Sequence, residues 1–437
     1  MSLLLKNVLA IDGQIDLHEV LDIRIEDGLI AEVGKDLSED GCEVRDLSGC
    51  IATPGFVDIH VHLREPGYEY KEDIESGTRA AAHGGMVAVC SMPNTDPVTD
   101  SASVIEFILR RSREAGHCRV LPSGACTKGL KGEILAEMGD MAHHGAVAFT
   151  DDGRGVQDAS MMRRVMEYAS QFDCPVMSHC QDESLVGSGQ INEGKVSTLL
   201  GLAGWPAQGE EIQISRDIEL CRLTGCQYHV QHVTTAHGIE LIRQAKANGL
   251  PVTCEVTPHH LFLDETDIDD SYNTFLKVNP PLRSKEDALA LIDAVVDGTV
   301  DALVTDHAPH ADFEKDLEFE EAPFGMTGIE TSLALYITNL IKPGVITWER
   351  LVELLAVNPR KILHQPPVML EPGYPADITI TDPDIVWTVT KEEFESKSCN
   401  SGFIGCELTG RARDVYVGGI ATLLDGAVTE LGKGVDA

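Results

Sequence analysis

Basic residues are scarce in this 437-residue chain, which has 34 Lys and Arg against 71 Asp and Glu. The formal net charge of −37 repels anionic nucleic acid and anionic membrane surfaces, so neither is expected as a partner. The acidic residues are spread along the sequence, which indicates a solvated surface. An anionic substrate would therefore require a locally positive site.

Long apolar runs and paired cysteine motifs are also absent. No stretch of about 18 apolar residues is available to span a membrane. The apolar run near the N-terminus is too short for a secretory signal. The twelve cysteines are scattered, without a Cys-x-x-Cys pair, and several lie inside apolar runs. This pattern indicates buried thiols in a reducing cytoplasm rather than a disulfide framework.

Eight apolar, β-favouring segments alternate with helical patterns in the middle of the chain. The strand candidates are 56–62, 86–93, 120–126, 146–152, 175–179, 228–233, 251–256 and 302–306. The helix candidates are 71–83, 101–115, 134–144, 159–172, 236–248, 285–296, 327–341 and 347–357. Eight βα units predict a closed (β/α)8 barrel of the TIM type. The alternative is an open doubly wound sheet, but no Gly-x-Gly-x-x-Gly turn follows an early strand.

Both ends of the chain read as short strands with turns. Strict alternation of apolar and polar residues is clearest at 376–383 and 412–419. We predict that the termini pair into one small β-sandwich domain. The predicted domain limits are 1–52 and 366–437 for that domain and 53–365 for the barrel. The stretch 181–217 is longer than a barrel loop requires, so we expect an extra helix or part of an interface there.

The segment 54–67 reads as a buried strand that runs into a loop. His60 and His62 lie two residues apart, so a strand places both imidazoles on one face. Arg64 follows on the same side, and its guanidinium suits a carboxylate. Two neutral imidazoles on one face suit a metal ion. A bare His-x-His is equally compatible with two histidines hydrogen-bonded in a core.

Polar residues also end several other predicted strands. Strand four ends in Asp151 and Asp152, strand five in His179, strand six in His232 and strand eight in Asp306. Each has an ordinary alternative, such as a helix cap for an aspartate or a buried, hydrogen-bonded histidine. Because these strand ends meet at one face of a βα barrel, their joint placement favours a metal site.

Nitrogen and oxygen ligands without cysteine suit zinc first, with manganese, cobalt or iron as alternatives. We expect one or two Zn²⁺ per subunit, a pair lying about 3.5–4 Å apart with a carboxylate and a hydroxide between the ions. This chemistry indicates hydrolysis of an amide-like bond, with the bridging hydroxide as nucleophile. Asp306 is predicted to act as general acid and base besides contacting metal. The alternative is an aspartate that only contacts metal.

The segment 55–67 resembles the signature of dihydroorotase, a cyclic-amide hydrolase of the amidohydrolase superfamily. Further blocks that resemble this family, in order, are 92–95, 149–153, 255–261, 279–283, 305–310 and 322–325. The resemblance implies reversible conversion of L-dihydroorotate and water into N-carbamoyl-L-aspartate, in de novo pyrimidine (UMP) biosynthesis. It also implies a homodimer or a complex with aspartate transcarbamoylase, although no interface stripe is legible.

The resemblance implies a role for each site residue. His60, His62 and Asp306 hold one metal ion, His179 and His232 hold the other, and Asp152, favoured over Asp151 by spacing, bridges them. The implied contacts to the substrate carboxylate are Arg64, Asn94 and His310. The implied contacts to the substrate ring are Asn279 and the backbone near Phe324 and Gly325. Asn94 and Asn279 have an alternative explanation as turn residues beside proline.

One departure separates subgroups of the superfamily. Many relatives, including hydantoinases and allantoinases, carry a carboxylated lysine on strand four, where this chain has Asp151 and Asp152. That matches the dihydroorotase branch with an aspartate bridge. The occupancy of the second metal site, the role of His259 and His260, and closure of the acidic loop 311–326 over substrate are left open.

Two alternative functions remain at this stage. The first is another cyclic-amide hydrolase, such as an allantoinase or dihydropyrimidinase, whose ring lacks the carboxylate that Arg64 would bind. The second is an inactive homologue that serves as a scaffold, which the complete ligand set argues against.

Overall fold

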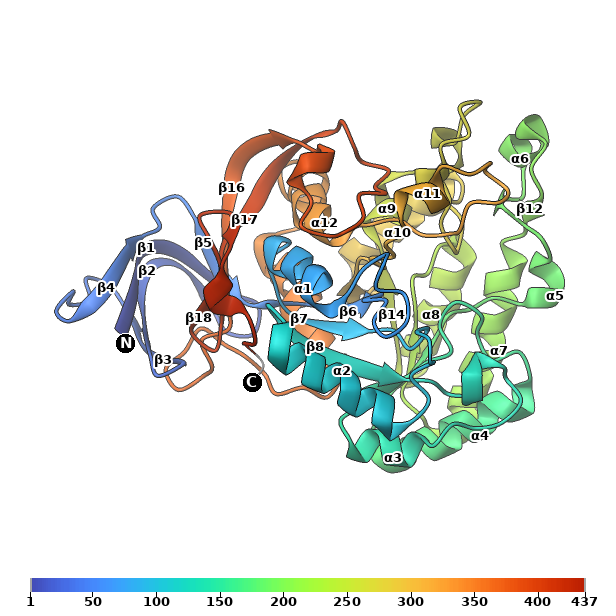
Figure 1. The fold of residues 1–437 in the computed structure, drawn as a ribbon, viewed down its shortest axis with the longest axis horizontal. Coiled ribbons are helices and arrows are strands. Elements are labelled where there is room, and N and C mark those ends of the chain that lie inside the picture. Colours follow the sequence, from blue (N-terminus) through green and yellow to red (C-terminus); the bar gives the residue numbers. More distant parts are fainter. Residues whose placement is uncertain (1, 436–437) are drawn as a thin grey trace.

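The computed structural model describes residues 2–435, which form a barrel and a separate sheet built from both chain ends (Figure 1). The barrel strands are β6 (Phe56–Val61), β7 (Met86–Ser91), β8 (Arg119–Gly124), β9 (Ala148–Phe149), β10 (Val176–Ser178), β13 (Tyr228–Val230), β14 (Val252–Val256) and β15 (Ala302–Leu303). Neighbouring strands pair in parallel in this order. A parallel bridge between Val61 and His307 closes the barrel, which confirms the predicted (β/α)8 fold.

Helices between the strands cover the outside of the barrel (Figure 1). They are α1 (Ile74–His83), α2 (Ala102–Ala115), α3 (Met138–His143), α4 (Ala159–Ala169), α7 (Gln208–Thr224), α8 (Ala236–Ala247) and α10 (Lys285–Asp297). Side-chain caps set four of the starts, because Asp73, Asp158, Thr235 and Ser284 each accept a hydrogen bond from the backbone N–H three residues on. The later helices α12 (Ile329–Tyr336), α13 (Trp348–Val352) and α14 (Asn358–Ile362) follow β15.

The chain makes an excursion between β10 and α7. It contains α5 (Glu183–Val186), β11 (Ile191–Asn192), α6 (Lys195–Leu200) and β12 (Gly204–Trp205), and β11 pairs with β12 in parallel. This confirms the extra helical structure expected in 181–217. Buried Arg283 ties the excursion to the barrel, since it donates to the Asn192 side chain at 3.0 Å and to the Trp205 carbonyl at 2.9 Å.

The two ends of the chain pair in one nine-stranded mixed sheet, as the alternating patterns predicted. Its strands are β1 (Ser2–Asp12), β2 (Leu17–Glu26), β3 (Leu29–Gly34), β4 (Cys42–Asp46), β5 (Ile51–Pro54), β16 (Ile378–Thr388), β17 (Glu407–Val417), β18 (Ile420–Leu424) and β19 (Ala427–Val428). Strand β5 joins the halves, because it pairs in parallel with β1 and antiparallel with β16. Both halves contribute to the core of this sheet, for example Leu5, Ile23 and Ile378. The domain limits at 52/53 and 365/366 stay predictions.

In the part of the chain that the structure describes, no helix has both the length and the apolar character needed to cross a membrane.

Gly55 connects the two domains between β5 and β6. Its N–H donates to the Asp377 carbonyl at 2.8 Å, and its own carbonyl accepts from Arg360 Nη1 at 2.7 Å. A Cβ added at Gly55 would lie 2.4 Å from Cγ1 of Val87, a buried residue of β7. The junction therefore has no room for a side chain.

Replacing Gly55 with Ala should destabilise the protein by about 1–3 kcal/mol, because the new methyl group overpacks a filled core. The measurement is the free energy of unfolding in urea. Adding Val87→Ala should recover part of the loss by removing the clashing methyl groups. Gly194→Ala is the matched control, since its added Cβ meets nothing closer than 3.5 Å. Equal losses from Gly55→Ala and Gly194→Ala would contradict this account.

Candidate metal centre

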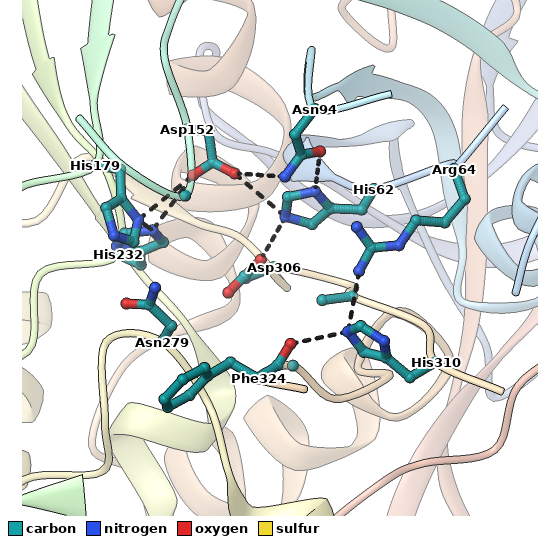
Figure 2. A pocket seen from close by; sticks show the side chains of 13 residues that line it. His62, Arg64, Asn94, Asp152, His179, His232, Asn279, Asp306, His310 and Phe324 are labelled. Atoms are coloured by element: carbon teal, nitrogen blue, oxygen red, sulfur yellow. Dashed lines mark hydrogen bonds and ion pairs between the residues drawn. The ribbon is translucent and has the colours of Figure 1, made fainter. Parts of the chain in front are cut away.

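Polar side chains converge at the carboxyl end of the barrel, and Asp152 lies between the His179/His232 pair and His62 (Figure 2). Its Oδ1 lies 3.5 Å from His60 Nε2, 3.6 Å from His179 Nδ1 and 3.7 Å from His232 Nε2. Its Oδ2 lies 3.5 Å from His62 Nε2. All five side chains are buried. One carboxylate is thus contacted by imidazoles that follow or belong to three different barrel strands.

A second carboxylate faces the first pair of histidines. Asp306 Oδ1 lies 3.0 Å from His62 Nε2 and 3.6 Å from His60 Nε2, and its other oxygen points away from them, toward Asn279 (Figure 2). Two groups have ligand atoms within 4.8 Å of one another. They are His60, Asp152 and His232, and His60, His62 and Asp306.

This donor set fits divalent cations. The Nε2 atom of His60 is buried without a hydrogen-bond partner in the described chain, although two carboxylates lie 3.5 and 3.6 Å away. Two donor atoms about 2.1 Å from one tetrahedral ion lie roughly 3.4 Å apart, close to those separations. His179 Nδ1 and His232 Nε2 also approach to 2.9 Å beside Asp152. A cation would account for the unpartnered His60 nitrogen that faces two carboxylates.

The histidines keep both carboxylates ionised. Burial alone raises the pKa of Asp152, but His60, His179 and His232 outweigh it and hold that pKa well below its usual value. The pKa of Asp306 is lowered by the same balance, because the hydrogen bond from His62 and the charge of His60 exceed the effect of burial. The ionised form is the one that binds a cation.

Glu255, in β14, orients His60 and was assigned no role from the sequence. Its carboxylate accepts from His60 Nδ1 at 2.6 Å and from His229 Nε2 at 2.9 Å. This bond leaves His60 Nε2 free to face the carboxylates. Burial raises the pKa of Glu255, yet His60 and His229 bring it down to about 2. The sequence signal was an acidic residue inside an apolar strand, which requires a partner.

Two amides orient two of the other imidazoles, those of His62 and His179. Asn94 Oδ1 accepts from His62 Nδ1 at 2.9 Å, so His62 presents Nε2 to the carboxylates. Gln181 Oε1 accepts from His179 Nε2 at 2.8 Å and from Asn279 Nδ2 at 3.3 Å. His179 therefore presents Nδ1. Sequence reasoning missed Gln181, and it treated Asn94 only as a substrate contact.

A pocket opens beside these residues. Its lining includes Arg64, Asn94, Gly153, Asn279, Ala308, His310, Phe324 and Gly325, as well as His62, Asp152, His179, His232 and Asp306. Arg64 and His310 form the wall opposite the metal-ligand candidates, with Arg64 Nη2 3.4 Å from His310 Nε2 (Figure 2). His310 Nε2 donates to the Phe324 carbonyl at 2.8 Å. The structure thus gathers every predicted substrate contact in one cavity, while their roles stay predictions.

The wall around His310 is locally positive in an otherwise acidic chain. Lys71 Nζ donates to His310 Nδ1 at 3.3 Å. Burial, and then Arg64, Lys315 and Lys71, lower the pKa of His310, which keeps its imidazole neutral. The sequence predicted Arg64 as a source of positive charge but not the two lysines.

Three residues around the pocket have left-handed backbone. The φ angles are +62° at Arg64, +30° at His232 and +45° at Asp306. Positive φ is uncommon for residues with a side chain and persists where the surroundings enforce it, often at functional sites. These turns end the extended strands at the positions that carry the polar groups.

Asp151, His259 and His260 belong to neither group of ligand candidates. Asp151 accepts backbone N–H bonds from Cys126 at 2.8 Å and Thr127 at 3.0 Å, away from the histidines. His260 bonds to the Thr257 hydroxyl and the Pro280 carbonyl. His259 is buried, and burial lowers its pKa to about 4.

Comparisons with known proteins agree with this architecture. A family model described as dihydro-orotase-like matches residues 49–238. A dihydroorotase from Geobacter metallireducens is 47% identical over 420 residues, covering 96% of this chain and 99% of the relative. One from Acetivibrio thermocellus is 46% identical over 417 residues, covering 95% and 98%. The solved L-hydantoinase (dihydropyrimidinase) from Arthrobacter aurescens has a TM-score of 0.89 at 26% identity, covering 99% of this chain and 98% of its own.

Replacing Glu255 with Gln should lower metal affinity about 10–100-fold, because the partner that orients His60 loses its charge. The measurement is metal retention against a chelator, followed by elemental analysis. Exposed Glu133→Gln is the matched control and should retain metal like the wild type. Unchanged metal retention in Glu255→Gln would remove Glu255 from the metal centre.

Proposed function

The chain belongs to the dihydroorotase family of the amidohydrolase superfamily, and we propose that it interconverts L-dihydroorotate and N-carbamoyl-L-aspartate. It is a cyclic-amide hydrolase, and the reaction is a step of de novo pyrimidine biosynthesis. We place it in the cytoplasm. The homodimer and the complex with aspartate transcarbamoylase stay predictions.

One observation supports this substrate above all: the pocket has a metal-ligand wall and, opposite it, a cationic wall at Arg64. L-Dihydroorotate carries a ring amide to be cleaved and a carboxylate to be held. A guanidinium forms strong, charge-assisted hydrogen bonds with a carboxylate. The two walls therefore match the two functional groups of the substrate.

We assign one metal ion to His60, His62 and Asp306 and a second to His179 and His232, with Asp152 between them. Zinc is the proposed ion, since imidazole and carboxylate ligands suit it. Divalent cations held there supply Lewis acidity, which lowers the pKa of water and polarises an amide carbonyl. Glu255, Asn94 and Gln181 keep the imidazoles in the tautomers that face the site.

Asp306 is the proposed general acid and base. One of its oxygens contacts His62, and the other is directed into the pocket (Figure 2). In hydrolysis it accepts the proton that the attacking water loses and delivers it to the ring nitrogen as the C–N bond breaks. In cyclisation it takes the proton from the carbamoyl nitrogen and returns it to the departing water.

The remaining pocket residues hold the substrate. We assign the carboxylate to Arg64, Asn94 and His310. Asn94 has a second N–H available for this, because only one is directed at Asp152. Asn279 and the backbone near Phe324 and Gly325 contact the ring.

The hydantoinases share the fold, yet two features favour dihydroorotate over their rings. Arg64 in the pocket has no carboxylate to bind in hydantoin or dihydrouracil. Asp152, which follows the fourth strand, is the proposed bridge, where hydantoinases carry a carboxylated lysine.

Removing metal with a chelator should abolish cyclisation of N-carbamoyl-L-aspartate, and adding Zn²⁺ should restore it. Elemental analysis before and after gives the metal identity and the number of ions per subunit. Adding Mn²⁺ or Co²⁺ in place of Zn²⁺ shows whether the recovered activity depends on the metal. Full activity in the metal-depleted protein would contradict the proposed mechanism, and absence of activity in the metal-loaded protein would contradict the proposed substrate.

Arg64→Met should raise KM for L-dihydroorotate about 10–100-fold, the cost of losing a charge-assisted hydrogen bond. Metal content should not change, because Arg64 is not among the ligand candidates. Exposed Arg163→Met is the control. A wild-type enzyme that hydrolyses dihydrouracil as well as L-dihydroorotate, or an unchanged KM in Arg64→Met, would favour the hydantoinase alternative.

A further inference from the structure

Two lysines are buried beside the segment that carries Phe324 and Gly325. Lys277 is 2% exposed and Lys315 is 3% exposed. Within residues 2–435, neither ammonium group forms an ion pair with a carboxylate. Burial lowers the pKa of Lys277 to about 8 and that of Lys315 to about 7. Such a costly placement requires compensating contacts.

Lys277 binds the backbone of the segment 316–325. Its Nζ donates to the Phe319 carbonyl at 2.7 Å and to the Glu320 carbonyl at 3.0 Å. The same ammonium group lies over the Phe324 ring, 4.6 Å from its centre, in a cation–π contact. Lys277 therefore fixes both the backbone and an aromatic side chain of this segment.

Lys315 binds the backbone of the same segment at Pro323. Its Nζ donates to the Pro323 carbonyl at 2.7 Å and to the Thr274 carbonyl at 3.1 Å. The Thr274 hydroxyl in turn donates to the Lys315 carbonyl at 2.5 Å. These bonds join the segment to the stretch that precedes Lys277 and Asn279.

The backbone of the segment 316–325, which the two lysines bind, forms part of the pocket wall. The Gly325 N–H donates to the Lys277 carbonyl at 2.8 Å, and the Phe324 carbonyl accepts from His310. The Phe324 ring also meets Trp205 edge to face, with centres 5.9 Å apart. Figure 2 shows the Phe324 carbonyl directed at His310, beneath Asp306 and Asn279.

We propose that Lys277 and Lys315 are positioning residues, which hold the segment 316–325 as a fixed wall and thereby set the affinity for the substrate ring. This rests on the proposed function, in which the backbone near Phe324 and Gly325 contacts the ring. A solvated loop requires no buried cation. A lid that opened at each turnover would have to break the carbonyl bonds of both lysines.

The test uses full-length, metal-loaded Lys277→Met and Lys315→Met, which keep a long side chain but lose the charge and the donors. We expect KM for L-dihydroorotate to rise at least about fivefold, because small misplacements of contacting groups are costly. We expect kcat to change less than about twofold, since the metal ligands and Asp306 are untouched. Metal content should match the wild type, and amide hydrogen exchange should accelerate across 316–325. Exposed Lys361→Met is the control.

Unchanged KM and exchange in both variants would overturn the proposal, as would equal effects in Lys361→Met. Exchange in the wild type provides a second test that does not depend on the variants folding. A fixed wall predicts that 316–325 exchanges at the same slow rate with and without N-carbamoyl-L-aspartate. Rapid exchange in the free enzyme that slows on binding would show a closing lid instead. Hydrogen exchange in the free enzyme can be interpreted even if the wild type does not act on L-dihydroorotate. That failure would overturn the proposed function but not the proposed fixed wall.

Discussion

The contact on which the whole site depends is that of one buried carboxylate, Asp152, with the imidazoles around it. Four histidines and two acids gathered at one face are costly to bury unless their charges and lone pairs compensate one another. The spacing leaves imidazole nitrogens that face oxygens at 3.5–3.7 Å instead of donating to them. A cation resolves that conflict, so the need to bury the ligands and the capacity to bind metal have the same origin.

Two sets of side chains in the barrel meet this requirement. The strand ends provide the ligand candidates, while Glu255, inside β14, and the amides of Asn94 and Gln181 set the orientation of three imidazole rings. The rings of His60, His62 and His179 are thereby held from the side away from the carboxylates. The opposite wall is built from groups of the other sign, so a single cavity carries both polarities within a chain whose net charge is −37.

The sequence was sufficient to predict the eight barrel strands and the polar side chains that converge at their ends, because both follow from local patterns; their role as metal ligands stays a prediction. Apolar runs indicate the strands, and an aspartate or histidine that follows such a run can be recognised from the sequence alone. The extent of the strands was overestimated: β9 has two residues where seven were predicted, since the chain leaves the ladder before Asp152. Glu255 was missed because its partners, His60 and His229, lie 195 and 26 positions away in sequence. Gln181 was missed although it lies two positions after His179, because a single glutamine after a strand has no distinctive pattern. Lys315 was missed because lysine in an acidic loop is usually solvated, and Lys277 was missed because no neighbouring residue in the sequence indicates that it is buried.

The position of β5 has a consequence for how the chain is made. One edge of β5 can pair with β1 soon after both strands emerge from the ribosome. Its other edge pairs with Ile378–Thr381 of β16, which is synthesised some 320 residues later. At about 5–20 residues per second, that edge stays unpaired for tens of seconds. The barrel is complete by then, so it can fold first and serve as the platform on which the sheet is closed. A nascent chain stalled before β16 would present an open β edge, the kind of surface that chaperones capture and that aggregates recruit.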